Sequence, residues 1–134
     1  MSLMKKTPLR KKRRKSSPLQ LIKEKAWKVF SLFIRNRDKF VCFTCGVRGD
    51  RTTTNAGHFK HNVLDFDEVN IHCQCIQCNH YKSGNLDVYA EKLVKMYGAG
   101  GFGELLKRAR LAQRGERMTI QDYQNIIDKY GEPK

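Results

Sequence analysis

The sequence predicts an α+β fold in which a small cysteine-rich core is flanked by several α-helices. Two observations carry this prediction. Four of the five cysteines form two Cys-x2-Cys pairs, Cys42 with Cys45 and Cys75 with Cys78, and short strand-like segments precede and separate them. Outside this region, apolar residues recur at three- and four-residue spacing, which is typical of amphipathic helices. A chain of 134 residues has room for one domain, or for one domain with appendages.

The chain begins with a basic tail and a helix. Residues 1–18 contain eight lysines or arginines and no acidic residue, so we expect this tail to be disordered when the protein is free. Residues 19–37 are predicted to form an amphipathic leader helix, and Pro18 suits its start. Its apolar stripe consists of Ile22, Ala26, Val29, Phe30, Phe33 and Ile34.

Residues 38–97 are predicted to form the core. Residues 40–43 and 56–60 have the composition of short strands, and Gly46 permits the positive φ that a metal-binding turn needs. A helix is predicted over residues 86–97, because its apolar side chains form one stripe.

Residues 98–134 are predicted to be a helical extension. One helix is expected over residues 102–113. Another is expected to begin at Thr119, because Thr119-x-x-Asp122 resembles a capping box, and to stop at Gly131.

The two cysteine pairs predict a structural zinc site. Zinc binds four thiolates tetrahedrally, and each Cys-x2-Cys turn presents two sulfurs to one ion. The predicted ligands are Cys42, Cys45, Cys75 and Cys78. Cys73 could replace Cys75, and His72 or His80 could enter a mixed site, but those spacings fit less well. Cys73 is therefore interpreted as a small buried thiol.

The charge of the chain points to a polyanionic partner. Lysine and arginine number 27 against 13 acidic residues, which leaves a net charge of +14. Such an excess repels itself unless a polyanion neutralises it. Nucleic acid is the first candidate and an anionic membrane surface the second. No apolar run approaches the roughly 20 residues that span a bilayer, so a cytoplasmic location, without a membrane, is the default expectation.

The motif region resembles a known family. Cys42-x2-Cys45, Gly57-His58-Phe59, Asn70-Ile71-His72 and the stretch from Gln74 through Cys75-x2-Cys78-Asn79 to Asn85 are similar to zinc-containing HNH endonucleases. More closely, they resemble the NinG/Rap family of phage recombination endonucleases. That resemblance implies a ββα-metal core built on a treble-clef zinc site. It also implies a nuclease acting on branched DNA, such as Holliday junctions and strand-invasion loops, in the cytoplasm of a phage host.

The resemblance assigns expected roles to several residues. His58 would be the general base, since a neutral imidazole accepts a proton near pH 7. Asn79 would offer its amide oxygen to a divalent ion, Mg²⁺ or Mn²⁺, at a phosphate-sized gap that it shares with His58. Asn70 would pin the loop between strands and orient His58. The expected DNA contacts are Lys11, Lys12, Arg13, Arg14, Lys60 and Lys82.

One residue departs from the pattern of related endonucleases. Many of them have an aspartate just before the general-base histidine, where it binds the metal, but this chain has Gly57. The ion then needs another ligand. Because they flank Asn70, His72 and Glu68 are the leading candidates. Asp65, Asp67 and His80 are further candidates.

Two functions are therefore weighed. The first is a metal-dependent, structure-selective DNA endonuclease, for which a homodimer built from the long helices is expected, since a junction has paired strands to cut. The second is a zinc-stabilised DNA-binding or adaptor module without catalysis. It shares the charge and the zinc site but does not require His58 or Asn79.

Overall fold

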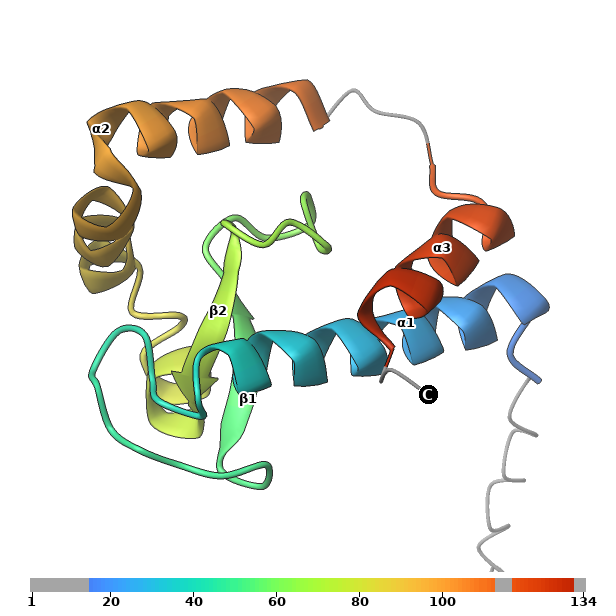
Figure 1. The fold of residues 1–134 in the computed structure, drawn as a ribbon, viewed down its shortest axis with the longest axis horizontal. Coiled ribbons are helices and arrows are strands. Elements are labelled where there is room, and N and C mark those ends of the chain that lie inside the picture. Colours follow the sequence, from blue (N-terminus) through green and yellow to red (C-terminus); the bar gives the residue numbers. More distant parts are fainter. Residues whose placement is uncertain (1–14, 113–116, 132–134) are drawn as a thin grey trace, which may run out of the picture.

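The computed structural model describes residues 15–112 and 117–131, and it has the mixed α+β architecture that the sequence predicts. A two-stranded antiparallel sheet lies at the centre, with helices on both faces (Figure 1). The elements in chain order are α1 (Pro18–Arg37), β1 (Thr54–His58), β2 (Ile71–Cys75), the π-helical segment η1 (Gln77–Tyr81), α2 (Leu86–Ala112) and α3 (Ile120–Tyr130). The finer treble-clef assignment stays a prediction.

Helix α1 matches the predicted leader helix within one residue. Its start is defined by the Ser17 hydroxyl, which accepts a hydrogen bond from the Gln20 amide at 3.2 Å, and by Pro18 in the first turn. The buried stripe contributes Phe30 and Ile34 to a core cluster with Ala56 and Ile71 of the sheet. The apolar periodicity of α1 therefore covers one face of the sheet.

Helix α3 packs along α1 and completes that layer (Figure 1). Its N-terminus carries the predicted capping box, with reciprocal hydrogen bonds between Thr119 and Asp122. Tyr130 packs edge-on against Phe30, with the ring centroids 4.9 Å apart. Gly131 ends the helix, as the sequence predicts.

The two strands pair over five residues, from Thr54 opposite Cys75 to His58 opposite Ile71. Side chains of a strand alternate between its two faces. Ala56 and His58 therefore face α1, whereas Gly57 faces the opposite layer. In the described part of the chain, the other edge of β1 is not paired with a strand.

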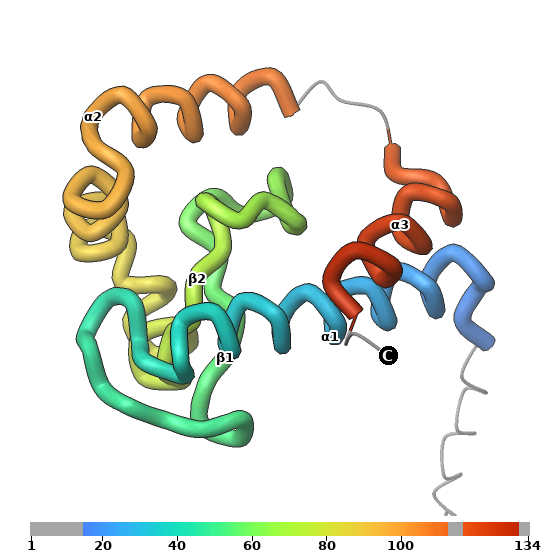
Figure 2. Tube along the Cα trace, in the orientation of Figure 1, coloured from blue at the N-terminus to red at the C-terminus, as the bar shows by residue number. Residues whose placement is uncertain are grey.

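Helix α2 forms the opposite layer. Tyr89, Leu93 and Leu105 are fully buried there, and aromatic residues from the loops pack against them. The trace of α2 turns sharply part-way along (Figure 2), because Gly98 adopts a φ of 78° and a ψ of 167°. The predicted break after residue 97 is therefore confirmed, and the next helix starts a few residues earlier than expected.

A turn replaces the strand predicted over residues 40–43. Only Val41 pairs, in an isolated bridge with Arg48. Lys39 and Phe40 have positive φ values, which interrupt an extended strand. Gly46 has the predicted positive φ, 80°, and its amide donates to the Cys42 carbonyl at 2.9 Å. The chain thus forms a compact turn around the first cysteine pair.

None of the helices in the described residues combines the length and apolar character that crossing a bilayer requires.

Tyr89 joins the two strands to α2, and we expect Tyr89→Phe to lower the free energy of unfolding by about 1–3 kcal/mol. The Tyr89 hydroxyl donates to the Gly57 carbonyl at 2.8 Å and lies within 3.2 Å of the Asn70 carbonyl. Removal of the hydroxyl takes the donor from the Gly57 carbonyl and the partner from His72 Nδ1, whereas the Asn70 carbonyl keeps the Phe59 amide at 2.9 Å. Chemical denaturation at fixed zinc concentration measures the loss. The exposed Tyr81→Phe is the matched control, and an equal loss in both variants would contradict the prediction.

Candidate functional site

The four predicted zinc ligands lie together. The sulfur atoms of Cys42, Cys45, Cys75 and Cys78 all lie within 4.8 Å of one another. The Cys45 and Cys75 sulfurs are 3.7 Å apart. Tetrahedral coordination at about 2.3 Å per bond places sulfurs roughly 3.8 Å apart. The cluster therefore has the donors and the size for one zinc ion.

The backbone around the cluster favours thiolates. The Cys45 amide points at the Cys42 sulfur and the Cys78 amide at the Cys75 sulfur, each at 3.4 Å. Burial opposes ionisation of Cys42, but hydrogen bonds from the Thr44 hydroxyl and nearby backbone amides outweigh it and lower the pKa of that thiol to about 6. Burial raises the pKa of the Cys45 thiol to about 12. A bound cation is what would allow all four to ionise.

Cys73 lies outside this cluster. Its side chain is fully buried, and burial raises the pKa of the thiol to about 11. It lies two residues before Cys75 and on the same face of β2, but the group of sulfurs that could share one ion comprises Cys42, Cys45, Cys75 and Cys78 without it. The structure thus separates Cys73 from the four clustered sulfurs, as the interpretation as a buried thiol requires.

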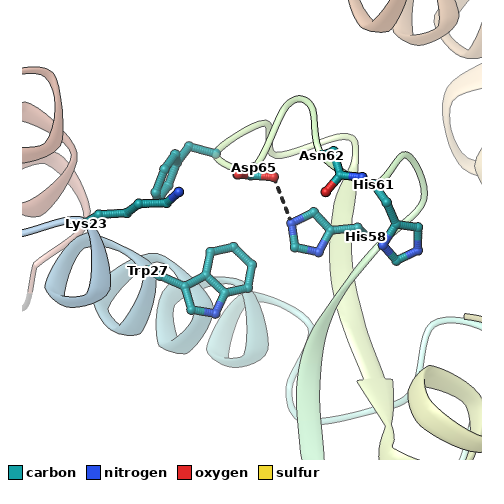
Figure 3. A pocket seen from close by; sticks show the side chains of 7 residues that line it. Lys23, Trp27, His58, His61, Asn62 and Asp65 are labelled. Atoms are coloured by element: carbon teal, nitrogen blue, oxygen red, sulfur yellow. Dashed lines mark ion pairs between the residues drawn. The ribbon is translucent and has the colours of Figure 1, made fainter. Parts of the chain in front are cut away.

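His58 lies at the end of β1 beside an open pocket of about 200 Å³ (Figure 3). The imidazole stacks on the Trp27 ring with the centroids 5.0 Å apart, and its Nε2 is 3.2 Å from Asp65 Oδ1. Because an ionised carboxylate only accepts, Nε2 carries the proton that is donated to Asp65. In the neutral ring this leaves Nδ1 as the acceptor.

Asp65 and Lys23 set the charge of this pocket. The hydrogen bond from His58 lowers the pKa of Asp65 and outweighs the opposing effect of its burial, and the nearby charge of Lys23 adds to the lowering. Asp65 is therefore an ionised partner for His58. The His58 side chain keeps 21% of its surface exposed, so a ligand in the pocket can reach the ring. The other lining residues include His61 and Asn62.

Asn70 pins the loop that joins the two strands. It is fully buried, and its Oδ1 accepts from the Lys60 amide at 2.8 Å. Its Nδ2 donates to the Lys60 and Leu64 carbonyls at 3.0 and 3.2 Å. Asp65 comes directly after Leu64, so these hydrogen bonds of Asn70 hold the part of the loop that carries Asp65, the hydrogen-bond partner of His58. This position agrees with the geometry expected for Asn70, and its catalytic contribution stays a prediction.

His72 does not face an ion site, which corrects the expectation that it binds the catalytic cation. The ring is fully buried and stacks on Phe43 at 4.0 Å between centroids. Both nitrogens meet tyrosine hydroxyls, Nδ1 with Tyr89 at 3.2 Å and Nε2 with Tyr97 at 3.0 Å. Burial, helped by the charge of Arg37, lowers the pKa of His72 to about 4. It is a neutral core residue.

Glu68 is also corrected as a cation ligand. Its exposed side chain accepts a hydrogen bond from the Tyr130 hydroxyl at 3.0 Å, which places it toward α3. Asp67 is engaged as well, because it accepts from Arg108 at 3.0 Å and from the backbone amides of Val69 and Asn70. Neither carboxylate faces Asn79.

Asn79 lies on the other face of β1. Its Oδ1 is 3.1 Å from the point where a Cβ on Gly57 would stand. His58, the next residue along the strand, points to the α1 face. The gap that His58 and Asn79 are expected to share stays a prediction: His58 stacks on Trp27 of α1, and the Asn79 side chain lies over Gly57.

The expected DNA-binding residues are only partly described. Lys60 and Lys82 are exposed, and the Lys60 ammonium lies 5.7 Å from the Phe59 ring centroid. Lys11, Lys12, Arg13 and Arg14 lie outside the described residues.

Sequence reasoning missed three contributors. Trp27, which adjoins the apolar stripe of α1, packs on the ring of His58. Asp65 was considered only as a cation ligand, although an acid close to a histidine in one loop is a signal for a hydrogen-bonded pair. Gln74 was not considered, although its fully buried side chain lies beside Gly57.

Comparisons with known proteins give a consistent family. The model described as "NinG: Bacteriophage Lambda NinG protein" matches residues 3–133. The chain is 33% identical over 112 residues to Protein ninG of Escherichia phage 933W, covering 80% of this chain and 53% of the relative. It is 32% identical over 112 residues to Protein ninG of Escherichia phage lambda, covering 80% and 52%. The chain thus spans about half the length of these curated relatives. No solved structure matches it.

These findings correct the family expected from the motifs. The family description and the names of the relatives identify a phage protein, NinG, and none of them names an HNH nuclease. The assignment to an HNH family of recombination endonucleases is therefore replaced by similarity to NinG alone.

We expect the purified chain to hold one zinc ion, and Cys78→Ala to lose it and to unfold the core, because the fourth thiolate closes the site. Cys73→Ala is the matched control, since it removes a buried thiol of the neighbouring strand and should keep full zinc content. Elemental analysis with circular dichroism measures both properties. Zinc loss from both variants, or from neither, would contradict the assignment.

His72 should remain neutral at pH 5.5, where an ordinary histidine is largely protonated. Since its folded-state pKa is about 4 against an unfolded value of 6.5, the unfolded chain binds the extra proton first. The stability contributed by His72 is therefore complete above about pH 6.5 and is lost as the pH falls through about 4. Nitrogen chemical shifts of the His72 ring in the zinc-loaded protein report its state, and an imidazolium at pH 5.5 would refute the buried assignment.

Proposed function

This chain belongs to the NinG family of bacteriophage proteins, and from that membership and the geometry of its pocket we propose that it is a metal-dependent DNA endonuclease. The observation that best supports this proposal is the half-buried imidazole of His58, which is hydrogen-bonded to Asp65 at the mouth of an open pocket. The proposed reaction is hydrolysis of a phosphodiester bond.

His58 is the proposed general base. Its Nε2 proton is committed to Asp65, so Nδ1 of the neutral ring is free to take a proton from an attacking water. Asp65 also stabilises the imidazolium that forms.

Three contacts position the base. Trp27 packs on one face of the imidazole, Asp65 fixes its rotation, and Asn70 holds the loop that carries Asp65. Asn70 is therefore proposed as a positioning residue that acts through Asp65. Such restraint reduces the reorganisation needed when His58 takes the proton from the attacking water.

The proposed position of the scissile phosphate is the unpaired edge of β1. Neighbouring residues of a strand are only about 3.3 Å apart along its axis. A phosphate at this edge could therefore meet His58 from one face of the strand and Asn79 from the other. Lys23 in the pocket and the exposed Lys60 and Lys82 would contact flanking phosphates.

Asn79 is proposed to hold a divalent cation, Mg²⁺ or Mn²⁺, through its amide oxygen. When bound, such an ion supplies charge stabilisation at the phosphate and at the leaving oxygen. The cysteine cluster would hold zinc in a structural role only, since four thiolates leave no open position.

DNA is the proposed substrate because the chain carries a net charge of +14. Branched recombination intermediates and a homodimeric assembly are part of the same proposal, and membership in a family of phage proteins supports action in the cytoplasm of a phage host. Recognition by shape and backbone suits a site with the exposed lysines Lys23, Lys60 and Lys82 around it.

A non-catalytic DNA-binding module is the second candidate. Two observations favour it: glycine occupies position 57, and His58 and Asn79 lie on opposite faces of β1. This module would use the same charge and cysteine cluster but would bind DNA without cutting it.

We expect His58→Ala to reduce cleavage of a labelled four-way junction by about 10²–10⁴-fold while binding is retained, because only the proton acceptor is lost. The control is His61→Ala, which removes an exposed imidazole of the same pocket. The assay contains Mg²⁺ or Mn²⁺. Tight binding without cleavage by the wild type under either ion would favour the non-catalytic module.

A further inference from the structure

The buried amide of Gln74 has one atom without a partner. Gln74 lies on β2 with no exposed surface. Among the described residues, its Oε1 is the buried side-chain atom that accepts no hydrogen bond. Buried polar groups are normally paired, so an unpaired oxygen in a packed layer points to a ligand.

The orientation of this amide is determined by its other contacts. Gln74 Nε2 donates to the Gly84 carbonyl at 2.8 Å and lies 3.2 Å from Thr44 Oγ1. A flipped amide would set its oxygen against the Gly84 carbonyl, and two acceptors repel each other. The unpaired atom is therefore the carbonyl oxygen, which is a cation ligand and not a donor.

Gln74 Oε1 points at the space over Gly57. A Cβ built on Gly57 would overlap this oxygen and would lie 2.7 Å from Gln74 Cδ. The same point is 3.1 Å from Asn79 Oδ1. Two amide oxygens thus converge over a residue that has no side chain, one from the buried Gln74 and one from Asn79, which is partly exposed.

We propose that Gln74 Oε1 and Asn79 Oδ1 together bind the divalent cation of the proposed nuclease, an inference that rests on that proposed function. Hard cations such as Mg²⁺ and Mn²⁺ take carbonyl and amide oxygens as ligands. This proposal explains why position 57 is a glycine, because any side chain there would collide with the amide oxygen that Gln74 supplies to the cation. The glutamine delivers an oxygen from the neighbouring strand to the place over position 57.

Neutral ligands have a consequence for affinity. Two amides carry no negative charge, so the cation should bind weakly to the free protein and more tightly once a DNA phosphate supplies charge. Binding of cation and DNA must then enhance each other by the same factor.

The test measures Mn²⁺ binding, not cleavage. Free Mn²⁺ is titrated by electron paramagnetic resonance against the zinc-loaded full chain, with and without a four-way junction, in a His58→Ala background that leaves the DNA intact. Gln74→Leu should weaken Mn²⁺ binding in the presence of DNA by at least about tenfold. Gln77→Leu is the matched control: the same change three residues along, at an exposed position, should leave Mn²⁺ binding unchanged. Wild-type affinity in Gln74→Leu would overturn the proposal.

A second variant supplies the cation-binding oxygen from position 57 of β1 in place of Gln74 of β2. Gly57→Asp alone should destabilise the protein, because the new side chain meets Gln74. Gly57→Asp combined with Gln74→Ala removes the collision and places a carboxylate in the same space. The double variant should bind Mn²⁺ at least as tightly as the parent chain and depend less on DNA. A double variant with full zinc content that does not bind Mn²⁺ would also overturn the proposal.

The two proposals fail in different ways. If the wild type cuts the junction and Gln74→Leu binds Mn²⁺ normally, the nuclease proposal is supported and the role of Gln74 as a cation ligand is refuted. If the wild type never cuts the junction but the Gln74→Leu variant loses Mn²⁺ binding, the role of Gln74 is supported and the nuclease proposal is refuted.

Discussion

The convergence of four cysteine sulfurs is the constraint on which the rest of this structure depends. Cys45 and Cys75 are thirty residues apart in the chain, yet their sulfurs are 3.7 Å apart. The first pair lies on a turn with little regular structure, and the second lies where β2 passes into η1. Phe43 also joins these segments, with its ring on His72 and its amide on the Cys73 carbonyl, and the sulfur cluster holds the end of β2 and, through it, the segment that carries Asn79.

The side chains of the candidate site are divided between the two faces of the sheet. The α1 face presents His58 against Trp27 and Asp65, and the α2 face presents Gly57 to Gln74 and Asn79. This division follows from strand alternation, because consecutive residues of β1 cannot point the same way. A substrate that meets both faces has to lie across the edge of the strand. In the described residues no further strand pairs with that edge of β1.

Aromatic and polar packing supports both faces. Tyr89 links the backbone at Gly57 and Asn70 to His72, while Asn70 holds the loop that precedes Asp65. The candidate site is therefore held mainly by side-chain contacts to the backbone of a short sheet. Such contacts leave little freedom for the imidazole, which suits a group that must accept a proton in one geometry. They also explain why His72, despite its position between two cysteine-rich segments, is a structural residue.

The sequence by itself determined the helices, the four clustered cysteines and the choice of Asn70 as the residue that holds the loop between β1 and β2. Helix α1, the break at Gly98 and the Thr119 capping box follow from local spacing and backbone preference, which are properties of neighbouring residues. The pairing of two Cys-x2-Cys turns is equally local in its parts. Only the tertiary structure decided which side chains meet. It buried His72 between two tyrosines, turned Glu68 toward α3, and set Asp65 against His58 and Gln74 over Gly57. These outcomes depend on strand register and on which layer covers each face, and neither is written in the spacing of one segment.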